Sequence, residues 1–148
     1  MIAGDELYKA FSEAPRPVAI TAGSITPERE RITDLLLPYT VDPQTARDIP
    51  DRLFDRYEIS AMLPVLTADA YRYFMPRCIE HAISHPNSGI VDGLVSSLSR
   101  LPKYDARISQ FTPTERAAVG EFIEYQSQQS SFDADQLKDA RGVWNAAV

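Results

Sequence analysis

The sequence is poor in the residues that most catalytic motifs require. It has one cysteine, Cys78, so no internal disulfide can form, which suits a reducing compartment. The six glycines form neither a phosphate-binding loop nor a dinucleotide-binding fingerprint, and there is no Cys-x-x-Cys pair. The Ser96–Ser97 pair lacks a Gly-x-Ser-x-Gly context. These absences leave NTPase, redox and serine hydrolase functions without support.

Positive charge and long apolar runs are also scarce. The chain has 15 Lys and Arg against 21 Asp and Glu, a formal net charge of −6. Such a chain repels nucleic acid phosphates and attracts basic partners. No apolar run approaches the ~20 residues that span a bilayer, and the first residues do not resemble a signal peptide. We therefore expect a cytoplasmic protein that binds neither nucleic acid nor membrane.

What the chain has in abundance is helical spacing. Apolar residues recur at i, i+3, i+4 and i+7, no segment alternates with a period of two, and no Asn-Gly or Asp-Gly hairpin turn occurs. Helix starts are marked by Thr26-Pro27, by Thr67 and by the capping box Thr112-Pro113-Thr114-Glu115, and a last helix is expected from about Asp133. We predict an all-α fold, with residues 1–148 forming a single domain of six or seven helices.

The clearest pattern covers residues 67–85. Its apolar side chains keep helical spacing over four turns; they are Tyr71, Phe74, Met75, Cys78, Ile79, Ala82 and Ile83. Pro76 lies inside this segment and removes one backbone donor, so a kink or a break is expected there. We predict that this kinked helix is the centre of the core.

Two segments resemble an uncharacterised bacterial family of small helical proteins. They read Leu-Thr-x-x-x-Tyr-Arg-Tyr-x-x-Pro from Leu66 and Thr-Pro-x-x-Arg-x-x-Val-x-x-Phe from Thr112. The resemblance covers roughly residues 50–125. It implies a helical domain of unknown function and carries over no catalytic residues; small bacterial proteins of this kind are often immunity or accessory proteins.

One group of candidate site residues is acidic. We expect a helix to open at Asp48, with four carboxylates on the face opposite its apolar residues: Asp48, Asp51, Asp55 and Glu58. Such a stripe would steer a basic protein partner. Two carboxylates at i and i+4 would also suit Mg²⁺ or acid–base chemistry. Arg47, Arg52 and Arg56 interleave with the acids, however, and this pattern is typical of a solvated face with ion pairs.

A second group lies near Pro76. A cleft at the expected break would present four polar side chains to a small molecule or substrate: Arg72, Tyr73, Arg77 and His81. In the alternative interpretation Tyr71 and Phe74 pack in the core, with Tyr73 and the arginines outside.

Cys78, His81 and His85 share one side of the same helix and are residue types that zinc accepts. There is no second cysteine, and Ala82 stands where a zincin would need Glu. The alternative is a buried cysteine with two histidines at the helix flank. We predict no metal site and no cofactor.

The sequence thus favours a protein-binding module over an enzyme. The specific hypothesis is an immunity-type protein that occludes a basic toxin or effector through its acidic residues, acting as a monomer or homodimer. One alternative is a ligand-binding domain or enzyme with its site near Pro76, and the other is a homo-oligomeric structural or regulatory subunit. Trp144 is expected to anchor the last helix; an exposed Trp144 would instead indicate an interface.

Overall fold

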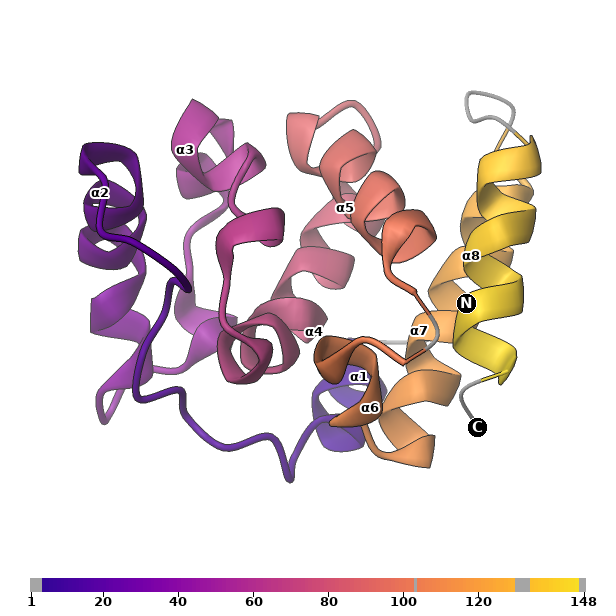
Figure 1. The fold of residues 1–148 in the computed structure, drawn as a ribbon, viewed down its shortest axis with the longest axis horizontal. Helices are drawn as coiled ribbons and strands as arrows, with labels where there is room; N and C mark the ends of the chain where they lie inside the picture. The colour runs from indigo at the N-terminus through magenta and orange to yellow at the C-terminus, as the bar shows by residue number, and fades with distance from the viewer. Residues whose placement is uncertain (1–3, 103, 130–133, 147–148) are drawn as a thin grey trace.

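The computed structural model describes residues 4–102, 104–129 and 134–146, and it confirms the all-α single domain (Figure 1). In these residues six helices have seven residues or more: α1 (Gly4–Ala10), α2 (Pro27–Leu36), α4 (Ala68–Ser84), α5 (Gly89–Arg100), α7 (Pro113–Ser127) and α8 (Ala134–Ala146). Two are single turns, α3 (Tyr57–Ser60) and α6 (Ala106–Ser109). Four 3₁₀ segments complete the description: η1 (Leu37–Thr40), η2 (Ala46–Asp48), η3 (Asp51–Asp55) and η4 (Leu63–Val65).

The helices lie side by side along the longest axis of the molecule. Figure 1 shows α2 at one end, α7 and α8 at the other, and α4 and α5 between them. The neighbours make contact in the same order: α2 packs on α3, α3 on α5, and α5 on α8, which also packs on α7. None of the helices in the described part of the chain has both the length and the apolar character needed to cross a bilayer.

The helix starts follow the predicted caps. The hydroxyl of Thr26 accepts the backbone N–H of Arg29, and that of Thr67 accepts the N–H of Ala70. At α7 the Thr112 and Glu115 side chains bond each other's backbone N–H groups, which confirms the capping box. The predicted start of the last helix, Asp133, falls outside the described residues, and α8 is described from Ala134.

Helix α4 is the centre of the core, as predicted. Eleven of its 17 residues are buried. Of the kink or break expected at Pro76, the break is excluded, because α4 continues through this residue. Pro76 cannot donate to the carbonyl of Arg72 and its ring crowds that carbonyl, which together cost about 3 kcal/mol in a helix interior. Packing on nearly all sides of α4 outweighs this loss.

The expected helix from Asp48 is also wrong. The chain instead forms short pieces, η2, η3 and α3, separated by extended residues at Ile49 and Arg56. Pro50 explains the first interruption, since a proline disfavours helical backbone in the residue before it. The carbonyl of Ile49 is then free to accept two hydrogen bonds from the Arg77 guanidinium, at 2.7 and 2.9 Å.

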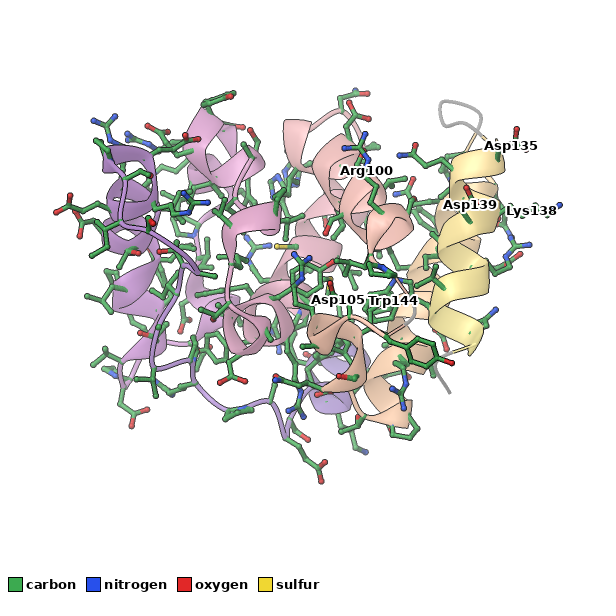
Figure 2. All side chains as sticks on the ribbon, in the orientation of Figure 1. Arg100, Asp105, Asp135, Lys138, Asp139 and Trp144 are labelled. Atoms are coloured by element: carbon green, nitrogen blue, oxygen red, sulfur yellow. The ribbon has the colours of Figure 1, made fainter. Side chains whose placement is uncertain are left out.

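Trp144 fixes the far end of the bundle and is fully buried, as the anchor prediction requires. Its indole N–H donates to the carbonyl of Leu98 on α5 at 3.1 Å, and its ring packs edge-on against Phe111 at 5.0 Å. Figure 2 shows Trp144 directed from α8 into the interior, while Lys138 projects outwards from the same helix. The alternative of an exposed Trp144 at an interface is therefore excluded.

Candidate functional site

The four predicted acidic residues do not share a helical face, because the segment that carries them is not one helix. Asp48 accepts the backbone N–H of Thr45 and closes its own capping box. Glu58 pairs with Arg31 of α2 at 3.0 Å. Asp55 is exposed at the end of η3. Asp51 turns towards α4. Their role in partner binding stays a prediction.

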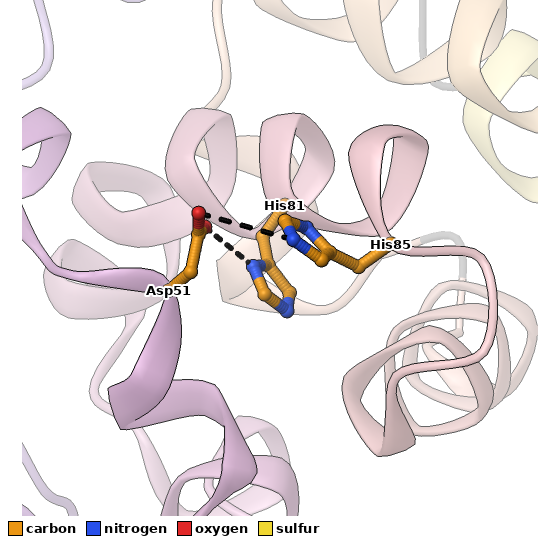
Figure 3. Close-up of side chains that lie close together, drawn as sticks. All are labelled: Asp51, His81 and His85. Atoms are coloured by element: carbon orange, nitrogen blue, oxygen red, sulfur yellow. Dashed lines mark hydrogen bonds and ion pairs between the residues drawn. The ribbon is translucent and has the colours of Figure 1, made fainter.

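Asp51 is the centre of a polar cluster that includes Arg77, His81 and His85. Its Oδ1 accepts a hydrogen bond from Arg77 Nη2 at 2.8 Å and lies 2.9 Å from His81 Nδ1. Its Oδ2 lies 3.9 Å from Nε2 of His85 (Figure 3). Hydrogen bonding first to Arg77 and then to His81 lowers the pKa of the Asp51 carboxyl to about 2. Asp51 is therefore ionised at every physiological pH.

The His81 side chain contacts neighbouring residues through its ring and through both ring nitrogens. Its ring is 2% exposed and stacks between Phe54, at 4.2 Å, and His85, at 4.4 Å. Its Nε2 lies 3.1 Å from the hydroxyl of Ser88. Burial lowers the pKa of His81, against the opposing effect of Asp51, so the imidazole is neutral near pH 7. A neutral imidazole keeps one lone pair for a proton or a metal ion.

Arg77 fixes the position of Asp51 by a hydrogen bond to its carboxylate. The guanidinium is buried and spreads its donors over the Ile49 carbonyl, Asp51 and Glu80. Glu80 in turn accepts the hydroxyl of Tyr8 from α1 at 2.9 Å. Arg77 therefore joins α1, α4 and η3 through one charged network, and its partners leave no donor visibly directed at a ligand.

The other residues of the predicted cleft are likewise engaged inside the chain. Arg72 donates through Nε to both carboxylate oxygens of Glu115, at 2.8 and 3.0 Å. The Tyr73 hydroxyl donates to the carbonyl of Tyr39 and accepts the N–H of Ala46. The interpretation that placed Tyr73 and the arginines outside is wrong for Tyr73 and Arg77, which are 8% and 6% exposed. Their role as ligand-binding residues stays a prediction.

The fold does not bring together the three zinc-type residues considered from the sequence, Cys78, His81 and His85. Cys78 is buried in the core, and burial raises the pKa of its thiol to about 12. His81 and His85 do lie together at the end of α4, but the third group beside them is Asp51. Neither Asp51 nor Ser88 was expected here, since helical spacing within 67–85 carries no information about residues from η3 or α5.

A second candidate surface lies beside α2. Val18 is fully exposed, Ile25 is 86% exposed and Leu37 is 49% exposed, and all three line one hollow of about 300 Å³. Two backbone hydrogen bonds hold the segment before α2 in place. The N–H of Ala22 donates to the carbonyl of Val65 in η4, and the N–H of Thr67, just after η4, donates to the carbonyl of Ile20. We call this the α2 hollow.

Glu58, one of the four predicted acidic residues, lies on the opposite flank of α2. A hollow of about 260 Å³ is lined by Glu28 and Arg31 of α2 together with Tyr57 and Glu58 of α3. Tyr57 is 75% exposed. Aromatic and charged side chains therefore border α2 on this flank, while the other flank combines aliphatic side chains with Arg29 and Glu30.

Comparisons with family models, with curated proteins and with solved structures found no match for this chain. The resemblance to the uncharacterised bacterial family stays a prediction.

Proposed function

We propose that the chain is a protein-binding module, and more specifically a bacterial, cytoplasmic immunity-type protein that blocks a toxin or effector by covering its active surface. The observation that carries the proposal is the α2 hollow, in which Val18, Ile25 and Leu37 expose aliphatic surface side by side. Single exposed apolar residues are ordinary, whereas apolar residues gathered around a hollow mark interaction surfaces.

Covering this hollow would contribute to the affinity of a complex. Full burial of one aliphatic side chain stabilises by about 1.5–3 kcal/mol, and each 1.4 kcal/mol corresponds to about tenfold in affinity. Leu37 is already half-buried, so Val18 and Ile25 have the most surface to gain. Such residues suit the buried core of an interface, which is more apolar than its rim.

The charges near the hollow indicate a basic partner. Glu30 lines the hollow beside Arg29, and both Glu30 and Asp34 are exposed on α2 and form no ion pair in the structure's described residues. The whole chain carries a net charge of −6. A partner with an aliphatic segment flanked by Lys or Arg therefore fits this surface, and its association is accelerated by charge. Occlusion needs a rigid surface and no chemistry.

The proposal is tested with the product of the gene next to this one, co-expressed and co-purified with the full chain. Replacing both Val18 and Ile25 by Ser is expected to weaken the complex at least about tenfold, because the aliphatic surface is lost from the hollow. Affinity is measured by calorimetry or interferometry at two salt concentrations.

The role of charge is tested with two charge reversals, one beside the hollow and one away from it as the matched control. Glu30→Lys is expected to slow association at low salt, whereas Asp139→Lys, on the exposed face of α8 (Figure 2), is expected to leave association unchanged. The proposal fails if no complex forms, or if the Val18/Ile25 double variant binds as tightly as the unchanged chain.

A further inference from the structure

The cluster of Asp51, His81 and His85 goes beyond the proposed protein interface. One ligand atom from each residue lies within 4.8 Å of the others. Two of the groups come from the end of α4 and the third from η3, 30 residues earlier than His81 in the chain. We propose that these three side chains form a binding site for one divalent transition-metal ion, of which zinc is the best fit.

The donor set determines the class of ion. Two imidazole nitrogens and one carboxylate oxygen are typical ligands of zinc, and they are poor ligands for Mg²⁺ and Ca²⁺, which prefer oxygen. Three protein ligands leave a fourth tetrahedral position for water. That position faces solvent here, since the Asp51 and His85 side chains are 56% and 46% exposed.

The distances require only a small adjustment. Zinc bonds of about 2.0–2.2 Å in a tetrahedron place the ligand atoms about 3.3–3.6 Å apart. His85 Nε2 is 3.9 Å from Asp51 Oδ2, whereas His81 Nδ1 lies 2.9 Å from the other carboxylate oxygen, Oδ1, in a contact that the ion would replace. His81 and His85 are stacked with 14° between their planes, so the His85 ring has to turn to aim Nε2 at the ion. His85 can turn because it is half-exposed and follows the last turn of α4.

The surroundings already supply the outer hydrogen bonds that metal ligands need. With the ion on Nδ1, His81 carries its proton on Nε2 and donates it to the Ser88 hydroxyl, 3.1 Å away. Arg77 holds Asp51 through Oδ1, which leaves Oδ2 towards the ion. The positive charge of Arg77 is more than balanced, because both Asp51 and Glu80 pair with it.

The site is tested on the full chain without a purification tag, after treatment with a chelator. Titration with Zn²⁺ by calorimetry is expected to show one ion per chain, and Co²⁺ is expected to give the visible absorption of tetrahedral coordination. His85→Ala and Asp51→Asn are each expected to weaken Zn²⁺ binding by more than about tenfold, since each removes one of three ligands.

Cys78→Ala is the matched control, because Cys78 shares the helix side suggested by the sequence but lies in the core. It is expected to leave Zn²⁺ binding unchanged. Circular dichroism checks that each variant is folded, and His85→Ala remains informative if Asp51→Asn unfolds, because His85 is half-exposed. The proposal is overturned if the unchanged chain binds no Zn²⁺ at 0.1 mM, roughly the weak end for specific sites, or if folded His85→Ala binds it equally well. Neither result bears on the complex at the α2 hollow.

Discussion

Replacing Glu115 by Ala is expected to lower the free energy of unfolding by about 3–5 kcal/mol. Glu115 is fully buried at the start of α7 and accepts both hydrogen bonds from Arg72 of α4. It also accepts the backbone N–H of Thr112 at 2.7 Å. The substitution therefore leaves a nearly buried guanidinium without its counter-charge and an amide without its cap, both of which are costly.

Two further variants test this prediction. The first separates charge from hydrogen bonding, and the second is a control at an exposed glutamate. Glu115→Gln keeps an acceptor for Thr112 and is expected to cost about 1–3 kcal/mol. Glu124→Ala removes a glutamate of the same helix whose pair with Arg141 is exposed, and it is expected to cost less than about 1 kcal/mol. Chemical denaturation measures all three. A loss below about 1 kcal/mol for Glu115→Ala would show that Arg72 and Glu115 do not tie α4 to α7.

Replacing Trp144 by Ala is expected to cost a similar amount, about 3–5 kcal/mol. The ring is fully buried where α8 packs on α5 and α7, and the alanine leaves a cavity beside Phe111. The carbonyl of Leu98 loses its donor as well. Trp144 is the largest of only three buried side chains of α8 in the described residues, with Leu137 and Ala140, so the amides of α8 are expected to exchange with solvent before those of α4.

Trp144→Phe tests which part of the indole matters. It retains most of the packing and loses the N–H, so a cost of about 1–3 kcal/mol is expected. Asn145→Ala, on the exposed side of α8, is expected to stay within about 0.5 kcal/mol of the unchanged chain. Equal stability of Trp144→Ala and Asn145→Ala in denaturation would contradict the anchoring role.

The parts of the fold that depend on neighbouring residues could be predicted from the sequence. The caps at Thr26, Thr67 and Thr112 each act within three residues, and all three are confirmed. The burial of the apolar face of α4 was also predictable from its spacing. Pro76 shows the limit, because a proline inside a helix predicts a local loss and the surrounding packing decides whether the helix breaks.

His81 and His85 were recognised from their spacing as residues that zinc accepts, but the rest of the candidate sites could not be predicted, since it depends on contacts between distant segments. Asp51 lies beside His81 because Pro50 interrupts the expected helix and Arg77 binds the carbonyl of Ile49. Nothing in the local spacing around Asp51 indicates either contact. Val18 and Ile25 belong to a segment without periodicity, so the sequence gives no sign that they are exposed side by side.

The central claim, that the α2 hollow is the protein-binding surface, is tested most directly by amide hydrogen exchange on the chain alone and in complex with the product of the adjacent gene. We expect added protection at residues 18–37 and unchanged exchange in α8. Protection confined to α7 and α8, with residues 18–37 exchanging as in the free chain, would contradict the claim.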